Sequence, residues 1–195
     1  MNIIYLHGFM SNSNSMKGVL LKNYIEQQSL DHKVYLPDLN MPPIQVINKV
    51  SILIQKLDDV VLVGSSLGGF YAAQLASYYE IPAVMINPAM QPWNLFRKLF
   101  GQTQIPFKVT EQWILDDHQL EDLEKLAVSF VKDAKKILVL LQQGDEILDY
   151  REAQRYYSVA THQSILMIEA KGNHAMNNFA EKIPMILQFL SDNIK

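Results

Sequence analysis

Cysteine is missing from the sequence altogether. Its absence excludes disulfide bonds, thiolate zinc sites and a cysteine nucleophile. Glycine and proline are also few, at 8 residues each in a chain of 195, while 49% of the residues are hydrophobic. Such a composition excludes collagen-like and low-complexity chains and is typical of a folded domain. Any covalent catalysis must therefore use a nucleophile other than a thiol.

Charge of one sign is not concentrated anywhere along the chain. The 17 basic and 20 acidic residues give a formal net charge of −3, and Lys and Arg never exceed two in a row. A nucleic-acid-binding domain needs a basic face or stripe, so we expect no nucleic-acid partner. The apolar runs, such as residues 137–141, are far shorter than the roughly 18 residues of a membrane span. The first residues also lack the features of a signal peptide, which favours a cytoplasmic location.

Short β-rich runs alternate with longer stretches of helical period. The short runs predict strands at residues 3–6, 34–36, 60–63, 83–86, 137–141 and 164–168. The longer stretches predict helices at residues 16–28, 44–57, 67–79, 119–132, 150–159 and 177–191. The strands are almost continuously apolar, as strands buried on both faces are. The pattern predicts an α/β fold with a shortened, about six-stranded, mostly parallel sheet, helices on both faces and ligands at the carboxyl ends of the strands.

One interval, around residues 87–118, interrupts this alternation. We expect one domain over residues 1–195, with this interval as a lid-like insertion, because long excursions in compact domains are often lids or binding loops. Aromatic residues gather in it, and three of them are candidates for a substrate pocket: Trp93, Phe96 and Trp113. The alternative is that these side chains simply cover the sheet, since aromatic residues also dominate ordinary cores.

The most informative motif is Gly64-Ser65-Ser66-Leu67-Gly68, which joins a buried strand to a helix. A serine on such a sharp turn projects its hydroxyl above the sheet, and the flanking glycines let the turn close. Ser66 is the predicted nucleophile, and the amide of Leu67 is a predicted oxyanion donor. Ser65 fits less well, because moving the frame by one position removes both glycines. The other interpretation is a glycine-rich turn that only packs or binds an anion.

A serine nucleophile needs a base, usually an imidazole that a carboxylate orients. His174 is the predicted base, because it lies in a short loop between the last strand and the last helix. The other candidates, His32, His118 and His162, lie in polar connections typical of the surface. The amide of Phe9 is the predicted second oxyanion donor, since a His-Gly pair, His7-Gly8, precedes it after the first strand. His7 is expected to support this loop by hydrogen bonding.

The acid that orients the base should follow a strand lying between nucleophile and base in the chain. Asp145 is the predicted acid, because it follows the strand at residues 137–141. Glu146 and Asp149 are its rivals, although Asp149 is better explained as the N-cap of the next helix. The resulting order of Ser66, Asp145 and His174 matches that of α/β-hydrolases.

With these residues the chain resembles the YqiA/YcfP-type family of small esterases of the α/β-hydrolase superfamily over nearly its whole length. The resemblance rests on the segments 5–9, 20–24, 64–69, 87–89, 142–146, 148–150 and 172–175. It implies the triad Ser66, Asp145 and His174, and a hydrolase of carboxylic esters or acyl thioesters that needs no metal and no cofactor. The chain departs from the family at Ala170-Lys171 and Met176, which bears on substrate preference more than on chemistry.

Two other functions compete with this one. The chain could be a catalytically silent interaction protein that kept the hydrolase scaffold, because a fold alone does not establish an activity. A degenerate copy is expected to lose a triad residue, and all three are present. A flavodoxin-like nucleotide or phosphate binder shares the repeated βα pattern, but the sequence lacks a Walker motif and a Gly-x-Gly-x-x-Gly fingerprint.

Overall fold

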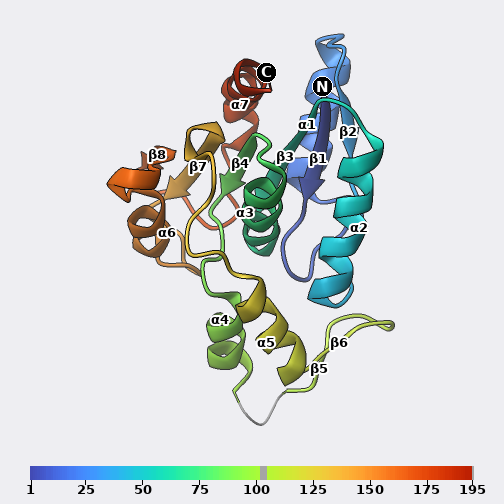
Figure 1. Cartoon of the computed structure of the whole chain (residues 1–195), viewed down its shortest axis with the longest axis vertical. Coiled ribbons are helices and arrows are strands. Elements are labelled where there is room, and N and C mark those ends of the chain that lie inside the picture. The colour runs from blue at the N-terminus through green and yellow to red at the C-terminus, as the bar shows by residue number, and fades with distance from the viewer. Residues whose placement is uncertain (102–104, 195) are drawn as a thin grey trace.

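The computed structural model describes residues 1–101 and 105–194. Its main sheet has six strands in the order β2-β1-β3-β4-β7-β8 (Figure 1). These strands are β1 (Asn2–Leu6), β2 (Lys33–Tyr35), β3 (Val60–Ser65), β4 (Ala83–Ile86), β7 (Ile137–Gln142) and β8 (Ile165–Glu169). All neighbouring strands of this sheet pair in parallel. The predicted α/β fold with a mostly parallel sheet is confirmed.

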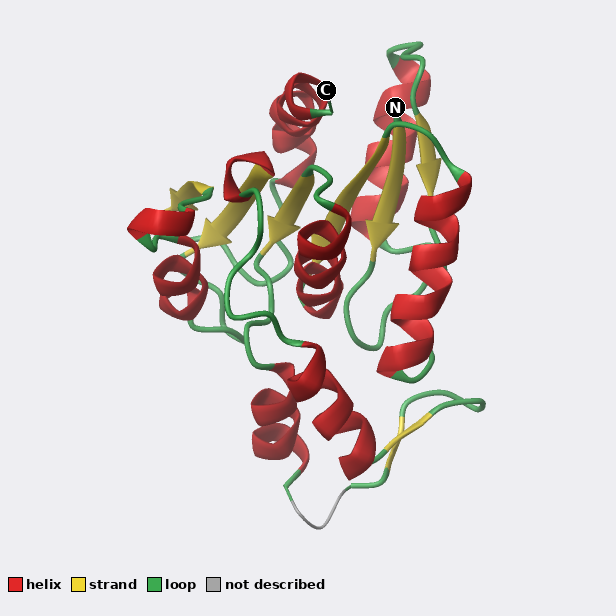
Figure 2. Cartoon of the chain, viewed as in Figure 1, coloured by secondary structure: helices red, strands yellow, loops and turns green. Residues whose placement is uncertain are grey.

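Helices cover both faces of this sheet (Figure 2). The α-helices of the described residues are α1 (Met16–Gln27), α2 (Pro43–Lys56), α3 (Leu67–Tyr79), α4 (Pro92–Phe100), α5 (Asp117–Leu126), α6 (Tyr150–Tyr157) and α7 (Phe179–Asn193). Of these, α1 and α7 pack on one face of the sheet, and α2, α3 and α6 pack on the other. Within the described ranges, no helix combines the length and the apolarity needed to cross a membrane.

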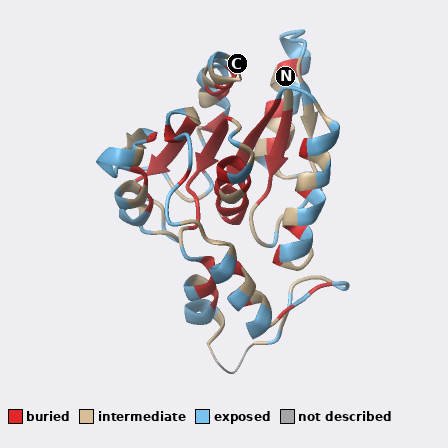
Figure 3. Cartoon of the chain, in the orientation of Figure 1, coloured by how far each residue is buried: buried red, intermediate tan, exposed pale blue. Residues whose placement is uncertain are grey.

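The buried residues form one hydrophobic cluster on each face of the sheet. Successive residues of β1 alternate between them: Ile3 packs with residues of α1 and α7, whereas Ile4 packs with residues of α2 and α3. The strands in the centre of the sheet are buried along their whole length (Figure 3). This double burial explains why their sequences are continuously apolar rather than alternating.

Helix α5 differs from the helix predicted at residues 119–132. It begins earlier because the side chain of Asp116 accepts a hydrogen bond from the amide of Gln119 and so caps the first turn. It ends at Leu126, so the helix predicted over residues 127–132 is wrong. The backbone of Val128 instead bonds to other helices, donating to Oε1 of Gln74 (2.8 Å) and accepting from the hydroxyl of Tyr156 (2.9 Å). Tertiary hydrogen bonds therefore replace the last predicted turns.

The interval at residues 87–118 contains α4 and the short antiparallel strands β5 (Phe107–Lys108) and β6 (Ile114–Leu115). Residues 102–104 of this predicted insertion lie outside the described residues. Helices α4 and α5 lie beyond the carboxyl ends of the strands (Figure 1). This is the edge of the sheet at which we expect the functional residues.

Candidate active site

Ser66 is the one residue between the end of β3 and the start of α3. Its backbone has φ 55° and ψ −120°, a conformation that non-glycine residues rarely adopt and that costs about 1–3 kcal/mol. Hydrogen bonds hold it there: its amide donates to the carbonyl of Ile86 (3.0 Å), and its carbonyl accepts from the amide of Ala89 (3.1 Å). The turn therefore fixes the Ser66 side chain at the carboxyl edge of the sheet.

The glycines on either side of Ser66 allow the backbone segments to approach closely. A Cβ atom at Gly64 would lie 2.2 Å from the carbonyl oxygen of Gly68, and one at Gly68 would lie 2.0 Å from the carbonyl oxygen of Leu6. Both contacts are to backbone atoms, which cannot rotate away as a side chain can. Helix α3 can follow Ser66 on this path only if both positions lack a side chain.

We expect Gly68→Ala to lower the free energy of unfolding by about 3 kcal/mol or more, because the new methyl group forces β1 and α3 apart. Urea denaturation followed by circular dichroism measures this change. Gly18→Ala in α1 is the matched control, since the nearest atom to its Cβ would be the end of the Leu36 side chain (2.9 Å), which is flexible. A Gly68→Ala protein with the urea midpoint of the wild type would contradict the packing argument.

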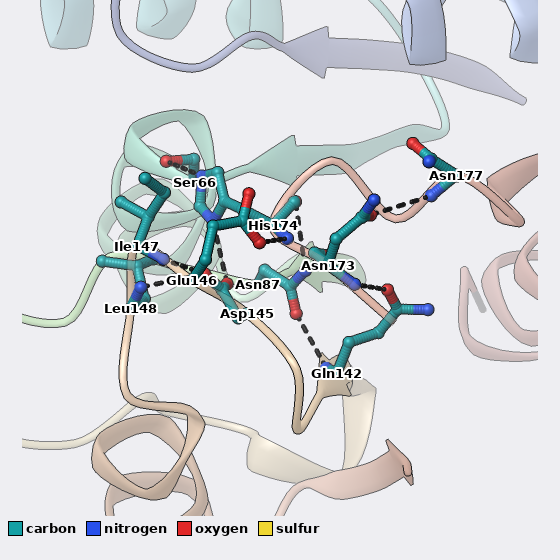
Figure 4. Close-up of polar contacts among 10 residues, drawn as sticks. All are labelled: Ser66, Asn87, Gln142, Asp145, Glu146, Ile147, Leu148, Asn173, His174 and Asn177. Atoms are coloured by element: carbon teal, nitrogen blue, oxygen red, sulfur yellow. Dashed lines mark hydrogen bonds and ion pairs between the residues drawn. The ribbon is translucent and has the colours of Figure 1, made fainter. Parts of the chain in front are cut away.

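His174 lies in the loop between β8 and α7, and its imidazole joins Ser66 to Asp145 (Figure 4). The Nε2 atom is 3.0 Å from Oγ of Ser66, and the Nδ1 atom is 2.8 Å from Oδ2 of Asp145. A carboxylate only accepts hydrogen bonds, so this pairing favours the tautomer with the proton on Nδ1. Nε2 is then free to accept a proton from the Ser66 hydroxyl.

The carboxylate of Asp145 is itself held in place. Its other oxygen, Oδ1, accepts hydrogen bonds from the amides of Ile147 (2.9 Å) and Leu148 (2.8 Å). Its side chain is only 2% exposed, compared with 21% for His174. The buried Asp145 thus orients the imidazole through Nδ1, while the His174 side chain keeps part of its surface exposed.

The two rival carboxylates make different contacts. Oε2 of Glu146 accepts a hydrogen bond from the backbone amide of His174 (2.9 Å), which lowers the pKa of the Glu146 carboxyl. Oδ1 of Asp149 accepts one from the amide of Arg151 (3.0 Å) and caps α6. Of these three carboxylates, Asp145 alone contacts the imidazole ring of His174.

A network of amide side chains holds the His174 loop, and no role was predicted for its members. Nδ2 of Asn87 donates to the carbonyls of Asn173 (3.2 Å) and His174 (3.1 Å), while Oδ1 of Asn87 accepts from the amide of Gln142 (2.9 Å). Oε1 of Gln142 accepts from the amide of Asn173 (2.8 Å). Asn87 and Gln142 lie at the ends of adjacent buried strands, and that position of a polar residue is the one signal that could have pointed to them.

The loop between β1 and α1 lies against Ser66. A Cβ atom at Gly8 would lie 3.7 Å from Oγ of Ser66. His7 is buried and ties this loop in place, since its Nε2 accepts from the amide of Leu39 (2.9 Å) and its Nδ1 donates to the carbonyl of Gly8 (2.8 Å). Across the described chain, the hydrogen bonds leave the amides of Phe9 and Leu67 without a protein acceptor.

A cavity of about 250 Å³ opens beside Ser66. It is lined by Tyr5, Gly8, Phe9, Ser11, Ser15, Met16, Lys17, Ser65, Ser66, His174 and Ala175. The structure does not bring the predicted pocket residues Trp93, Phe96 and Trp113 to this cavity. They are buried in the hydrophobic cluster behind Phe9, whose ring centroid is 4.6 Å from that of Phe96 and 5.9 Å from that of Trp113. Their burial fits the alternative in which these aromatic residues form core.

The three other histidines considered as the base make contacts away from Ser66. His118 pairs with Asp122 on α5 (3.4 Å), and His32 and His162 bond to their chain neighbours. In residues 1–101 and 105–194, no group of three or more His, Asp or Glu side chains could hold a metal ion.

Comparisons with known proteins agree with this architecture. The model of an uncharacterised protein family, UPF0227, matches residues 2–191. A UPF0227 protein of Pectobacterium atrosepticum is 29% identical over 80% of this chain and 84% of its own, and one of Citrobacter koseri is 27% identical over 96% and 97%.

Solved structures resemble the chain over almost its whole length. Mouse alpha/beta hydrolase domain-containing protein 10 superposes with a TM-score of 0.73 at 17% identity, covering 98% of this chain and 89% of its own. The structure of Est1E from Butyrivibrio proteoclasticus with bound ferulic acid has a TM-score of 0.73 at 15% identity, covering 99% and 89%. The chain therefore has the α/β-hydrolase fold.

Proposed function

We propose that this chain, which belongs to the uncharacterised protein family UPF0227 and has the α/β-hydrolase fold, is a serine hydrolase of carboxylic esters or acyl thioesters. One observation carries the proposal. Three side chains from distant parts of the chain form a continuous line of hydrogen bonds, with Ser66 3.0 Å from His174 and His174 2.8 Å from Asp145. This arrangement of nucleophile, base and orienting acid supports catalysis of acyl transfer.

In the first half of the reaction, Oγ of Ser66 attacks the carbonyl carbon of the substrate while Nε2 of His174 takes the hydroxyl proton. Asp145 stabilises the imidazolium that forms. The carbonyl oxygen becomes an oxyanion, to which the free amides of Phe9 and Leu67 can donate. One such donor contributes about 3–4 kcal/mol to transition-state stabilisation.

The tetrahedral intermediate then collapses. The bond to the alcohol or thiol leaving group breaks, and His174 gives that group its proton, which leaves an acyl group on Ser66. A water molecule attacks this acyl-enzyme while His174 takes its proton. His174 then returns that proton to Oγ of Ser66 as the acyl–oxygen bond breaks, which releases the acid product and restores Ser66. Neither a metal nor a cofactor has a part in these steps.

The competing proposal is a catalytically silent protein that uses the same scaffold for interactions. The two differ in the reactivity of Ser66, because a fluorophosphonate labels only a serine that a base activates. Stoichiometric labelling of Ser66 supports the hydrolase. A folded protein whose Ser66 stays unlabelled, and which cleaves no p-nitrophenyl or acyl-CoA ester, would favour the interaction protein.

We expect Asn87→Ala to lower kcat about 10- to 100-fold with a smaller change in KM, because the His174 loop loses its two bonds to Nδ2 of Asn87. Steady-state kinetics with a p-nitrophenyl ester measures both constants. Asn94→Ala is the matched control, since Nδ2 of Asn94 donates only to the side chain of Gln91 (2.8 Å). Equal kcat and KM values in Asn87→Ala and Asn94→Ala would contradict a role of Asn87 in positioning the His174 loop.

A further inference from the structure

Lys17 brings a positive charge into the cavity beside Ser66. It lies in the first turn of α1 and lines the cavity together with Ser66 and His174, and no Asp or Glu is among the lining residues. Its neighbour on the same helix, Lys22, is exposed and forms an ion pair with Glu26. Among the ion pairs and side-chain hydrogen bonds of the described residues, Lys17 has no partner.

The Lys17 side chain is half-buried, and no carboxylate forms an ion pair with its ammonium group within the described residues. Burial lowers the pKa of Lys17, and the negative charge of Asp145 acts in the opposite direction. Lysine is normally placed where water or a carboxylate surrounds its charge, because removing it from water without a partner is unfavourable. An anion that entered the cavity would supply the missing partner.

Further hydrogen-bond donors surround the same space. Ser11 and Ser15 line the cavity, although Oγ of Ser15 is itself buried and lies beside the Tyr5 hydroxyl. Ser15 precedes α1 without capping it through its side chain, and the first turn of α1 contains no acidic residue. The cavity thus offers the Lys17 cation and the Ser11 hydroxyl, and none of its lining residues is negatively charged.

We propose that the cavity binds substrates in which an anionic group, a carboxylate or a phosphate, lies close to the scissile carbonyl, and that Lys17 determines this specificity. This inference rests on the proposed hydrolase function and names the substrate class of the same site. Lys17 acts by binding the anion while Ser66, His174 and Asp145 carry out the acyl transfer.

The test compares two p-nitrophenyl esters of equal acyl length, the neutral pentanoate and the anionic hydrogen glutarate. At low ionic strength, we expect the wild type to have at least a 10-fold higher kcat/KM for the glutarate, and salt to reduce this ratio by screening. Lys17→Met is expected to lower the ratio at least 10-fold, and Lys17→Arg to keep most of it. Lys22→Met is the matched control and should keep the wild-type ratio, because Lys22 is exposed.

Competitive inhibition separates the two kinds of anion. Stronger inhibition by glutarate than by inorganic phosphate identifies a carboxylate site, and the reverse identifies a phosphate site. The inference would be overturned if the wild type had nearly equal kcat/KM values for the glutarate and the pentanoate. It would also be overturned if the ratio of these values in Lys17→Met stayed within twofold of the wild-type ratio. If the Lys17 variants fail to fold, the wild-type ratio and its salt dependence decide the matter.

Failure of this inference can be told from failure of the proposed function. Hydrolysis of the pentanoate and labelling of Ser66 by a fluorophosphonate, without any preference for the glutarate, would reject only the anion site. Absence of both hydrolysis and labelling in a folded wild-type protein would reject the hydrolase and the anion site together.

Discussion

Ser66→Ala is expected to lower the turnover of carboxylic esters by about four to six orders of magnitude, because the covalent acyl-enzyme can no longer form. The remaining rate reflects binding and the oxyanion donors alone. The measurement is a panel of p-nitrophenyl and acyl-CoA esters with wild type and variant, which also separates esters from thioesters. The wild type should release an initial burst of p-nitrophenol equal in concentration to the enzyme. Ser66→Ala should show no burst.

Ser65→Ala provides the control for the identity of the nucleophile. Ser65 is the last residue of β3 and is buried beside Ser66, yet only Ser66 has its hydroxyl next to the imidazole of His174. We expect Ser65→Ala to remain labelled by a fluorophosphonate and Ser66→Ala not to be. Labelling that survives in Ser66→Ala and disappears in Ser65→Ala would assign the nucleophile to Ser65.

Asp145→Asn is expected to lower kcat about 10⁴-fold while the protein stays folded. The reason lies in the two oxygens of the carboxylate. Oδ1 accepts from the amides of Ile147 and Leu148, so an asparagine would keep its carbonyl oxygen there and turn its NH₂ group toward Nδ1 of His174. Nδ1 would then have to accept, and the proton would move to Nε2, where it blocks the removal of the Ser66 proton.

Two conservative variants serve as controls for Asp145→Asn. Asp149→Asn should keep kcat within about 10-fold of wild type, because asparagine caps a helix about as well as aspartate. Glu146→Gln should also have a much smaller effect than Asp145→Asn, because its side chain bonds to the backbone of His174 and not to the ring. A loss in Asp149→Asn as large as that in Asp145→Asn would reassign the acid.

The outline of the fold could be predicted from local patterns. The six strands of the main sheet end within two residues of their predicted limits, because continuous apolar runs such as that of β7 bury both faces of a strand. Helix α4 and the strands β5 and β6 were not predicted, and the predicted end of α5 was wrong, since that end depends on Gln74 and Tyr156, which are distant in sequence. The local period of apolar residues determines whether an element is a helix or a strand, whereas contacts with other elements can determine where it ends.

The candidate site likewise has features that the local sequence predicts and features that depend on tertiary contacts. The sequence by itself determined the serine turn, because Gly64, Ser66 and Gly68 must lie in one frame for the turn to close. It also predicted the chain order of Ser66, Asp145 and His174, the proposed nucleophile, acid and base. Only the tertiary structure decided which carboxylate meets the imidazole, where Asn87 anchors the loop and that Lys17 lines the cavity beside Ser66. The physical reason is distance along the chain: a motif within five residues can be identified from the local sequence, but side chains from separate strands meet only after the sheet has set their directions.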